Sequence, residues 1–141
     1  MKKIAVVYWS DTGNTEAMAN YVKEGAEAAG AEVVMATPAD FDESSIASLD
    51  SIAFGCPAMG EEVLEESEFE PMFDSCKDKL AGKKVGLFGS YGWGDGEWMR
   101  TWEENCQESG IQLAGDCVIC NYEPDDEGAA ACRELGAELA A

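Results

Sequence analysis

Short apolar runs alternate with amphipathic stretches along the whole chain, and this alternation limits the fold more than any other feature. The runs suited to buried strands are 3–9, 32–36, 51–55, 84–89 and, in broken form, 111–119. Helical periodicity between them predicts helices at 14–29, 65–80, 97–109 and 125–140. Continuously apolar strands separated by helices indicate a parallel sheet covered on both faces. With right-handed crossovers, we expect an α/β fold, a doubly wound three-layer sandwich on a five-stranded parallel sheet.

The size and composition of the chain restrict it further. At 141 residues it is expected to form one domain spanning 1–141. A hydrophobic content of 46% is too high for a disordered chain, even at a net charge of −20. No apolar run approaches the length of a membrane span, and the short apolar stretch near the N-terminus does not resemble a signal peptide. We therefore expect a soluble, cytoplasmic, monomeric protein with no membrane partner.

The cysteine and histidine counts exclude several kinds of chemistry. Six cysteines without a targeting signal favour free thiols. Cys117 and Cys120 have the CxxC spacing, but in an extended segment residues three apart point to opposite faces of a sheet. The chain has no second CxxC and no histidine, so we expect no tetrahedral metal site. Without histidine the chain also lacks the commonest general base. No cysteine is followed six residues later by arginine, which excludes a CxxxxxR phosphatase.

The turn after the first apolar run is rich in groups that bind an anion. Its residues, 10–15, read SDTGNT and lead directly into the first predicted helix. Unpaired N–H groups and the helix dipole favour negative charge at such a helix start, and the hydroxyl and amide side chains add donors. A nucleotide triphosphatase loop uses a lysine for the outer phosphates, and this turn contains neither lysine nor arginine. The turn therefore predicts a site for one terminal phosphate that stays intact.

Two further loops fall at the same edge of the expected sheet, where doubly wound folds bind ligands. In 89–96 Trp93 stands between glycines, which favours a stacking platform for a flat ring over a tryptophan folded back on its own sheet. The opposing loop carries Met59 beside Gly60, a candidate for the second face of that ring. Neither loop contains GxGxxG, the dinucleotide fingerprint. One phosphate site and one ring site together predict a bound mononucleotide.

Acidic residues crowd around these loops. The chain has 29 acidic and 9 basic residues, and 61–70 alone contains six glutamates. Most basic residues lie instead near 2–3 and 77–84, at the far end of the expected sheet. This polarity predicts a negative face that orients the protein toward a basic partner, and it excludes nucleic acid, whose phosphates would be repelled. It also disfavours adding negative charge to a bound ring.

The chain resembles the short-chain bacterial flavodoxins, closest to those of clostridial and other anaerobes. The resemblance covers essentially the whole chain. Its most specific motifs are YWSDTGNTE at 8–16, GCPAMG at 55–60, EESEFEP at 65–71 and GKKVGLFGSYGWGDG at 82–96. It implies the strand order 2-1-3-4-5 and non-covalently bound FMN as the cofactor. The long-chain members have an insertion in strand five, for which 111–121 has no room.

The resemblance also implies a role for particular residues. The FMN phosphate would lie in the 10–15 turn, and the isoalloxazine ring between Met59 and Trp93. The Gly60 carbonyl would accept a bond from the reduced flavin N5–H after the Gly60-Glu61 peptide flips, which stabilises the neutral semiquinone. The Glu62 side chain would contact N3, and N–H groups around 92–94 would meet the pyrimidine end. Asn121 and its neighbours would line the ribityl chain or ring edge. The candidate cofactor-binding residues are Ser10, Asp11, Thr12, Gly13, Asn14, Thr15, Pro57, Ala58, Met59, Gly60, Glu61, Glu62, Ser90, Tyr91, Gly92, Trp93, Gly94 and Asn121.

The implied function is low-potential one-electron transfer, with FMN shuttling between semiquinone and hydroquinone and no catalytic residues. The expected partners are basic-faced redox enzymes, namely reductases, oxidoreductases and hydrogenase-type enzymes. One alternative is a flavodoxin-like NAD(P)H:quinone oxidoreductase, which needs a substrate pocket that extra loops usually provide. Another is a non-redox receiver or phosphate-binding module, which needs an acidic cluster after strand one, where the chain has only Asp11.

Asp11 departs from the family pattern, in which glycine is usual at this position. A carboxylate beside a phosphate dianion costs Coulomb energy unless it turns into solvent. We therefore expect FMN to bind, but with a weaker phosphate contact than glycine would allow.

Overall fold

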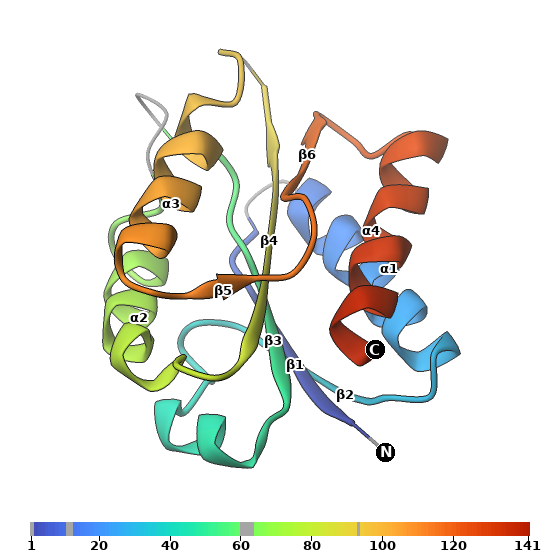
Figure 1. Ribbon diagram of the computed structural model, residues 1–141. Helices are drawn as coiled ribbons and strands as arrows, with labels where there is room; N and C mark the ends of the chain where they lie inside the picture. The colour runs from blue at the N-terminus through green and yellow to red at the C-terminus, as the bar shows by residue number, and fades with distance from the viewer. Residues whose placement is uncertain (1, 11–12, 60–63, 93) are drawn as a thin grey trace.

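The computed structural model describes residues 2–10, 13–59, 64–92 and 94–141, and over these it forms a three-layer α/β sandwich (Figure 1). The central parallel sheet has the order β2-β1-β3-β4-β5, with β6 also paired to β4. Its strands are β1 (Lys3–Tyr8), β2 (Glu32–Ala36), β3 (Ser51–Gly55), β4 (Lys84–Tyr91), β5 (Gln112–Leu113) and β6 (Val118–Asn121). The predicted fold class and strand order are confirmed.

The helices cover the two faces of the sheet in pairs. Figure 1 shows α1 (Asn14–Ala28) and α4 (Asp126–Ala140) on one side, and α2 (Phe69–Cys76) and α3 (Glu97–Glu108) on the other. Two short 3-10 helices, η1 (Glu43–Ser48) and η2 (Lys77–Lys79), complete the described elements. The sequence did not predict η1, whose first turn is capped by the Asp42 carboxylate, which accepts a hydrogen bond from Ser44 N–H at 2.9 Å.

Alternate residues along the strands enter two separate cores. In β1, Ile4 and Val6 pack on the α1 and α4 side, whereas Ala5 and Val7 pack on the α2 and α3 side. The core on the α2 and α3 side contains aromatic rings that meet edge to face. The centroid of the Trp102 ring lies 5.4 Å from that of Phe69 and 5.5 Å from that of Phe73. Burial on both faces explains why the strands read as continuous apolar runs.

Glycines lie where helices α1 and α4 meet and let the two backbones approach each other. A Cβ added to Gly25 would lie 1.9 Å from the Arg133 carbonyl oxygen, and one added to Gly136 would lie 2.1 Å from the Val22 carbonyl oxygen. Real Cβ atoms do not approach backbone oxygens this closely. The two glycines therefore set the depth to which α4 packs on α1.

The fifth strand departs from the single broken run expected over 111–119. It forms two pieces on the same neighbour, since Val85 pairs with Leu113 and Phe88 pairs with Val118. Residues 114–117 thus lie opposite only two residues of β4, and Gly115 takes the positive φ of 65° that lets the chain leave the ladder and return. Strand β4 in turn runs to Tyr91, two residues beyond the apolar run, because β6 pairs with its end.

Helix α2 begins at Phe69 rather than at Glu65, where the periodicity began. The Glu65 side chain is 7% exposed and acts as a cap for the helix. Its carboxylate accepts hydrogen bonds from Glu68 N–H at 2.7 Å, from Phe69 N–H at 2.8 Å, and from both the N–H and the hydroxyl of Ser67. Burial raises the pKa of this carboxyl, but these donors outweigh it and hold the pKa at about 2.

Candidate functional site

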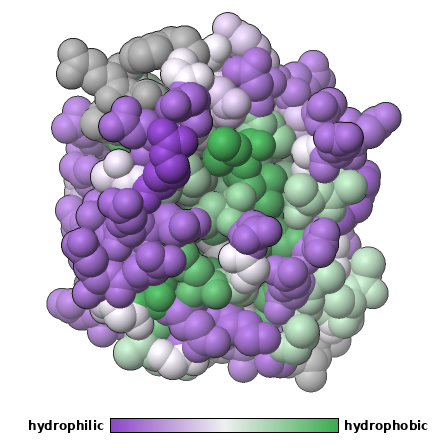
Figure 2. Space-filling view, turned by 45° about the horizontal axis from the view of Figure 1, so that its top comes forward, coloured by the Kyte–Doolittle hydropathy of each residue, from purple (hydrophilic) through white to green (hydrophobic). Residues whose placement is uncertain are grey.

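A hollow of about 220 Å³ lies at the carboxyl ends of the strands, where the loops after β1, β3, β4 and β6 meet. Its described lining residues are Ser10, Asn14, Thr15, Pro57, Ala58, Met59, Ser90, Tyr91, Gly92 and Tyr122. Nine of these ten belong to the set predicted from the sequence. Figure 2, which tilts this end of the molecule toward the viewer, shows a largely hydrophilic surface interrupted by apolar patches.

The loop after β1 brings a helix start to the hollow. Gly13 precedes α1 with a φ of 97° and, as a glycine, offers no side-chain cap of its own. The Ser10 hydroxyl accepts a hydrogen bond from Glu16 N–H at 3.2 Å, which folds the turn back over the first turn of α1. Thr15 is buried, and its hydroxyl accepts a hydrogen bond from Ser90 N–H at 3.4 Å. Hydroxyl groups and a helix N-terminus therefore converge at the described part of this turn, and both can bind an anion.

The loop after β3 is held against the end of β4. Ala58 N–H donates to the Ser90 carbonyl at 3.0 Å, and the Trp98 indole N–H donates to the Cys56 carbonyl at 3.1 Å. Gly89 allows this contact, because a Cβ there would lie 2.1 Å from the same Cys56 oxygen. Cys56 is fully buried, and burial raises the pKa of its thiol to about 12, so the side chain supports the loop without reacting.

The turn after β6 closes the fourth side. Tyr122 N–H donates to the Tyr91 carbonyl at 2.8 Å, and the Ser90 hydroxyl donates to the Tyr122 carbonyl at 2.7 Å. The Asn121 amide donates to the Tyr91 carbonyl at 3.2 Å, so its side chain ties two loops together and is not among the lining residues. Sequence reasoning did not single out Tyr122, although an aromatic residue directly after Asn121 at the binding edge was a signal.

The remaining predicted residues divide into two groups. Gly13 and Gly94 are described, both with positive φ, but do not line the hollow. The residues Asp11, Thr12, Gly60, Glu61, Glu62 and Trp93 lie outside the described part of the chain. The predictions made for them therefore stay predictions.

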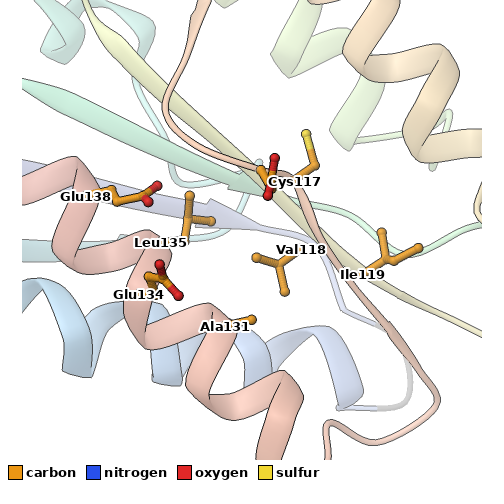
Figure 3. Close-up of a pocket in the computed structure, with 8 residues that line it drawn as sticks. Cys117, Val118, Ile119, Ala131, Glu134, Leu135 and Glu138 are labelled. Atoms are coloured by element: carbon orange, nitrogen blue, oxygen red, sulfur yellow. The ribbon is translucent and has the colours of Figure 1, made fainter.

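A second cavity, of about 280 Å³, lies between β6 and α4 (Figure 3). Ala131 and Leu135 of α4 face Val118 of β6 there, and the lining also includes the carboxylates of Asp116, Glu134 and Glu138. Three carboxylates would repel a phosphate, whereas the described lining of the first hollow carries no charge. The distribution of charge thus distinguishes the two cavities as sites for a phosphorylated ligand.

The two cysteines of the CxxC spacing lie on opposite sides of the sheet, as predicted. The Cys117 thiol donates to the Glu103 carboxylate on α3 at 3.0 Å, and Figure 3 shows its sulfur directed away from α4. Cys120 packs in the core beneath α1 and α4, where it contacts Cys132. Over the described residues no group of three or more acidic, cysteine or histidine side chains is placed to hold a metal ion.

The family model for flavodoxin matches residues 6–136. The chain belongs to the flavodoxin family. It is 50% identical over 133 residues to the flavodoxin of Megasphaera elsdenii, covering 94% of this chain and 95% of the relative. It is 45% identical to the flavodoxin of Clostridium beijerinckii over 96% of this chain and 97% of the relative. The solution structure of two-electron reduced Megasphaera elsdenii flavodoxin superposes with a TM-score of 0.89, covering 97% of this chain and 98% of that one.

Flavodoxins are electron carriers that bind FMN and are not enzymes, and the close relatives place this chain among them. The oxidoreductase and receiver alternatives are not favoured. In this flavodoxin the described lining of the hollow suits FMN, because it joins a helix start with hydroxyl side chains to the apolar side chains of Pro57, Ala58 and Met59, and no charged side chain is among these described residues. Within the part of the chain that is described, no helix is both long enough and apolar enough to cross a membrane.

Proposed function

We propose that residues 1–141 form one domain that holds FMN in the hollow at the carboxyl ends of the strands. The phosphate lies at the 10–15 turn, and the ring lies against the loops that carry Met59 and Trp93. Bound FMN supplies the capacity to accept and release electrons one at a time. The protein's own residues bind and orient it, and they exclude water from one side of the ring. The observation that carries this proposal is the described lining beside the start of α1, which bears hydroxyl groups and no charge.

A comparison of FMN with riboflavin, which lacks the phosphate, tests the assignment of the two ends. We expect Ser10→Ala to weaken FMN binding about tenfold and to leave riboflavin binding unchanged. Met59→Ala should weaken both ligands, because the lost contact is to the ring. Glu134→Gln in the second cavity is the matched control and should affect neither. Fluorescence quenching of each flavin by the apoprotein gives the dissociation constants, and loss of binding in the control alone would reject the site.

Electron transfer is tested on the reconstituted protein. An anaerobic reductive titration followed by visible absorption should show FMN reduced in two separate one-electron steps. NADPH alone should leave the flavin oxidised, as expected of an electron carrier of the flavodoxin family. Rapid bleaching by NADPH would instead support an oxidoreductase.

We propose further that the partners are redox enzymes with a basic face around their own cofactor. The net charge of −20 supports this, and so do Lys3 and Lys84, which begin β1 and β4 at the far end of the sheet from the hollow. Lys83 donates to the Leu49 carbonyl at 2.7 Å and Lys84 to the Ala141 carbonyl at 3.3 Å, so both are tied to that end. Electron transfer to a basic cytochrome should therefore slow as ionic strength rises. A rate independent of salt would contradict the proposal.

Six free cysteines support a location in a reducing compartment, which we propose is the cytoplasm.

A further inference from the structure

Tyr122 has an unusual backbone conformation for its residue type. Among the described residues it is the one non-glycine residue with positive φ, at 59°. Side chains with a bulky ring disfavour this region, and such outliers persist only where the surroundings fix them. The surroundings here are the end of β4, because both polar groups of the Tyr122 backbone are bonded there, to the Tyr91 carbonyl and the Ser90 hydroxyl.

The conformation directs the phenol ring onto the backbone of the neighbouring loop. A Cβ built at Gly92 would lie 3.2 Å from Tyr122 Cε1 and 3.7 Å from its hydroxyl oxygen. The ring therefore packs where Gly92 leaves room for it, next to the segment that leads to Trp93. The ring also lines the hollow. Tyr122 is 61% exposed, more than Val34 or Ile119, the other exposed large hydrophobic residues in the described part of the chain.

We infer that the Tyr122 ring is a ligand-contacting wall of the FMN site and holds Gly92 in position. The inference rests on the proposed location of FMN in this hollow. An aromatic ring with a free face beside a site for a flat, apolar ligand offers contact area at little cost in side-chain entropy. The left-handed backbone is what brings that face to the hollow, since an extended residue would carry the side chain elsewhere. A residue that merely closed a turn would be expected to be glycine or asparagine at this φ.

Chemical modification tests the contact directly. The chain has four tyrosines, and Tyr8, Tyr21 and Tyr91 are half-buried whereas Tyr122 is exposed. Treatment of the apoprotein with tetranitromethane should nitrate Tyr122 first, as peptide mass mapping would show. Saturation with FMN should protect Tyr122 strongly and leave Tyr21 unchanged, because Tyr21 lies on α1 against Arg133, with 4.8 Å between the guanidinium carbon and the ring centroid. Equal nitration of Tyr122 with and without FMN would overturn the inference.

Two variants separate the ring from the turn. Tyr122→Phe keeps the ring, and Tyr122→Asn removes it while keeping a residue that tolerates positive φ. We expect Tyr122→Asn to weaken FMN binding about fivefold and Tyr122→Phe to bind like the wild type. The thermal unfolding of both apoproteins should match the wild type or exceed it. Wild-type affinity in Tyr122→Asn would refute the role of the ring, whereas failure of the wild type to bind FMN would overturn the proposed function together with it.

Discussion

Glu65 offers a test of how a buried carboxylate stabilises the start of α2. Its ordinary pKa of 4.5 falls to about 2 in the folded protein, despite burial, because the Ser67 hydroxyl and three backbone N–H groups donate to it. A gap of about 2.5 pH units at 1.36 kcal/mol per unit corresponds to about 3 kcal/mol of folding free energy. Since the folded pKa is the lower one, this stabilisation is complete above pH 4.5 and is lost as the pH falls toward 2.

Glu65→Gln is the informative change, since the amide keeps one acceptor oxygen but presents an NH₂ group to donors. We expect the variant to be about 3 kcal/mol less stable than the wild type at pH 7, by urea unfolding of the FMN-free protein followed by circular dichroism. The difference should shrink progressively between pH 4.5 and pH 2. The control is Glu66→Gln, an exposed neighbour, which should stay within about 0.5 kcal/mol of the wild type. A Glu65→Gln deficit that is the same at pH 7 and pH 3 would refute the reasoning.

Three further changes test the packing and the site. Gly136→Ala should lower the free energy of unfolding by about 2 kcal/mol or more, because the added Cβ meets the Val22 carbonyl oxygen. This loss exceeds the gain of about 1 kcal/mol that alanine ordinarily brings to a helix. Wild-type stability in urea unfolding would contradict the close packing of α4 on α1. Cys56 should resist iodoacetamide at pH 8 until the protein unfolds, since its thiol is buried and has a pKa of about 12. Peptide mass mapping reads the labelling, and labelled Cys56 in the native protein would contradict this expectation. Asp11→Gly should tighten FMN binding about fivefold at low salt, with a smaller gain at high salt. An unchanged dissociation constant at low salt would show that the carboxylate does not act on the phosphate.

Local pattern was enough to predict the sheet, because burial on both faces makes each strand a continuous apolar run. Strands β2 and β3 begin and end where their runs do. The division of the fifth strand could not be predicted, since it depends on which residues of 114–117 find a partner on β4. The extension of β4 to Tyr91 depends likewise on pairing with β6, a contact between segments far apart in the sequence.

The site was predicted as far as it depends on the types of residue in each loop. Hydroxyl groups, glycines and Met59 at the carboxyl ends of strands pointed to the hollow that the structure shows. Tyr122 was missed because its importance comes from a left-handed backbone that hydrogen bonds to β4 impose, which no local pattern reveals. Glu65 was read as part of an acidic stretch, and its burial as a helix cap depends on how α2 packs.

The divided fifth strand also bears on how copies of this flavodoxin behave when crowded together. Exposed sheet edges invite a second chain to add a strand, and a long uninterrupted edge is the most dangerous template. At this edge β5 provides two residues and β6 four, with the detour through 114–117 between them. An incoming strand would lose its register at the detour, so it could not extend a ladder along the whole edge. Together with mutual repulsion between chains of charge −20, this protects the protein from aggregation.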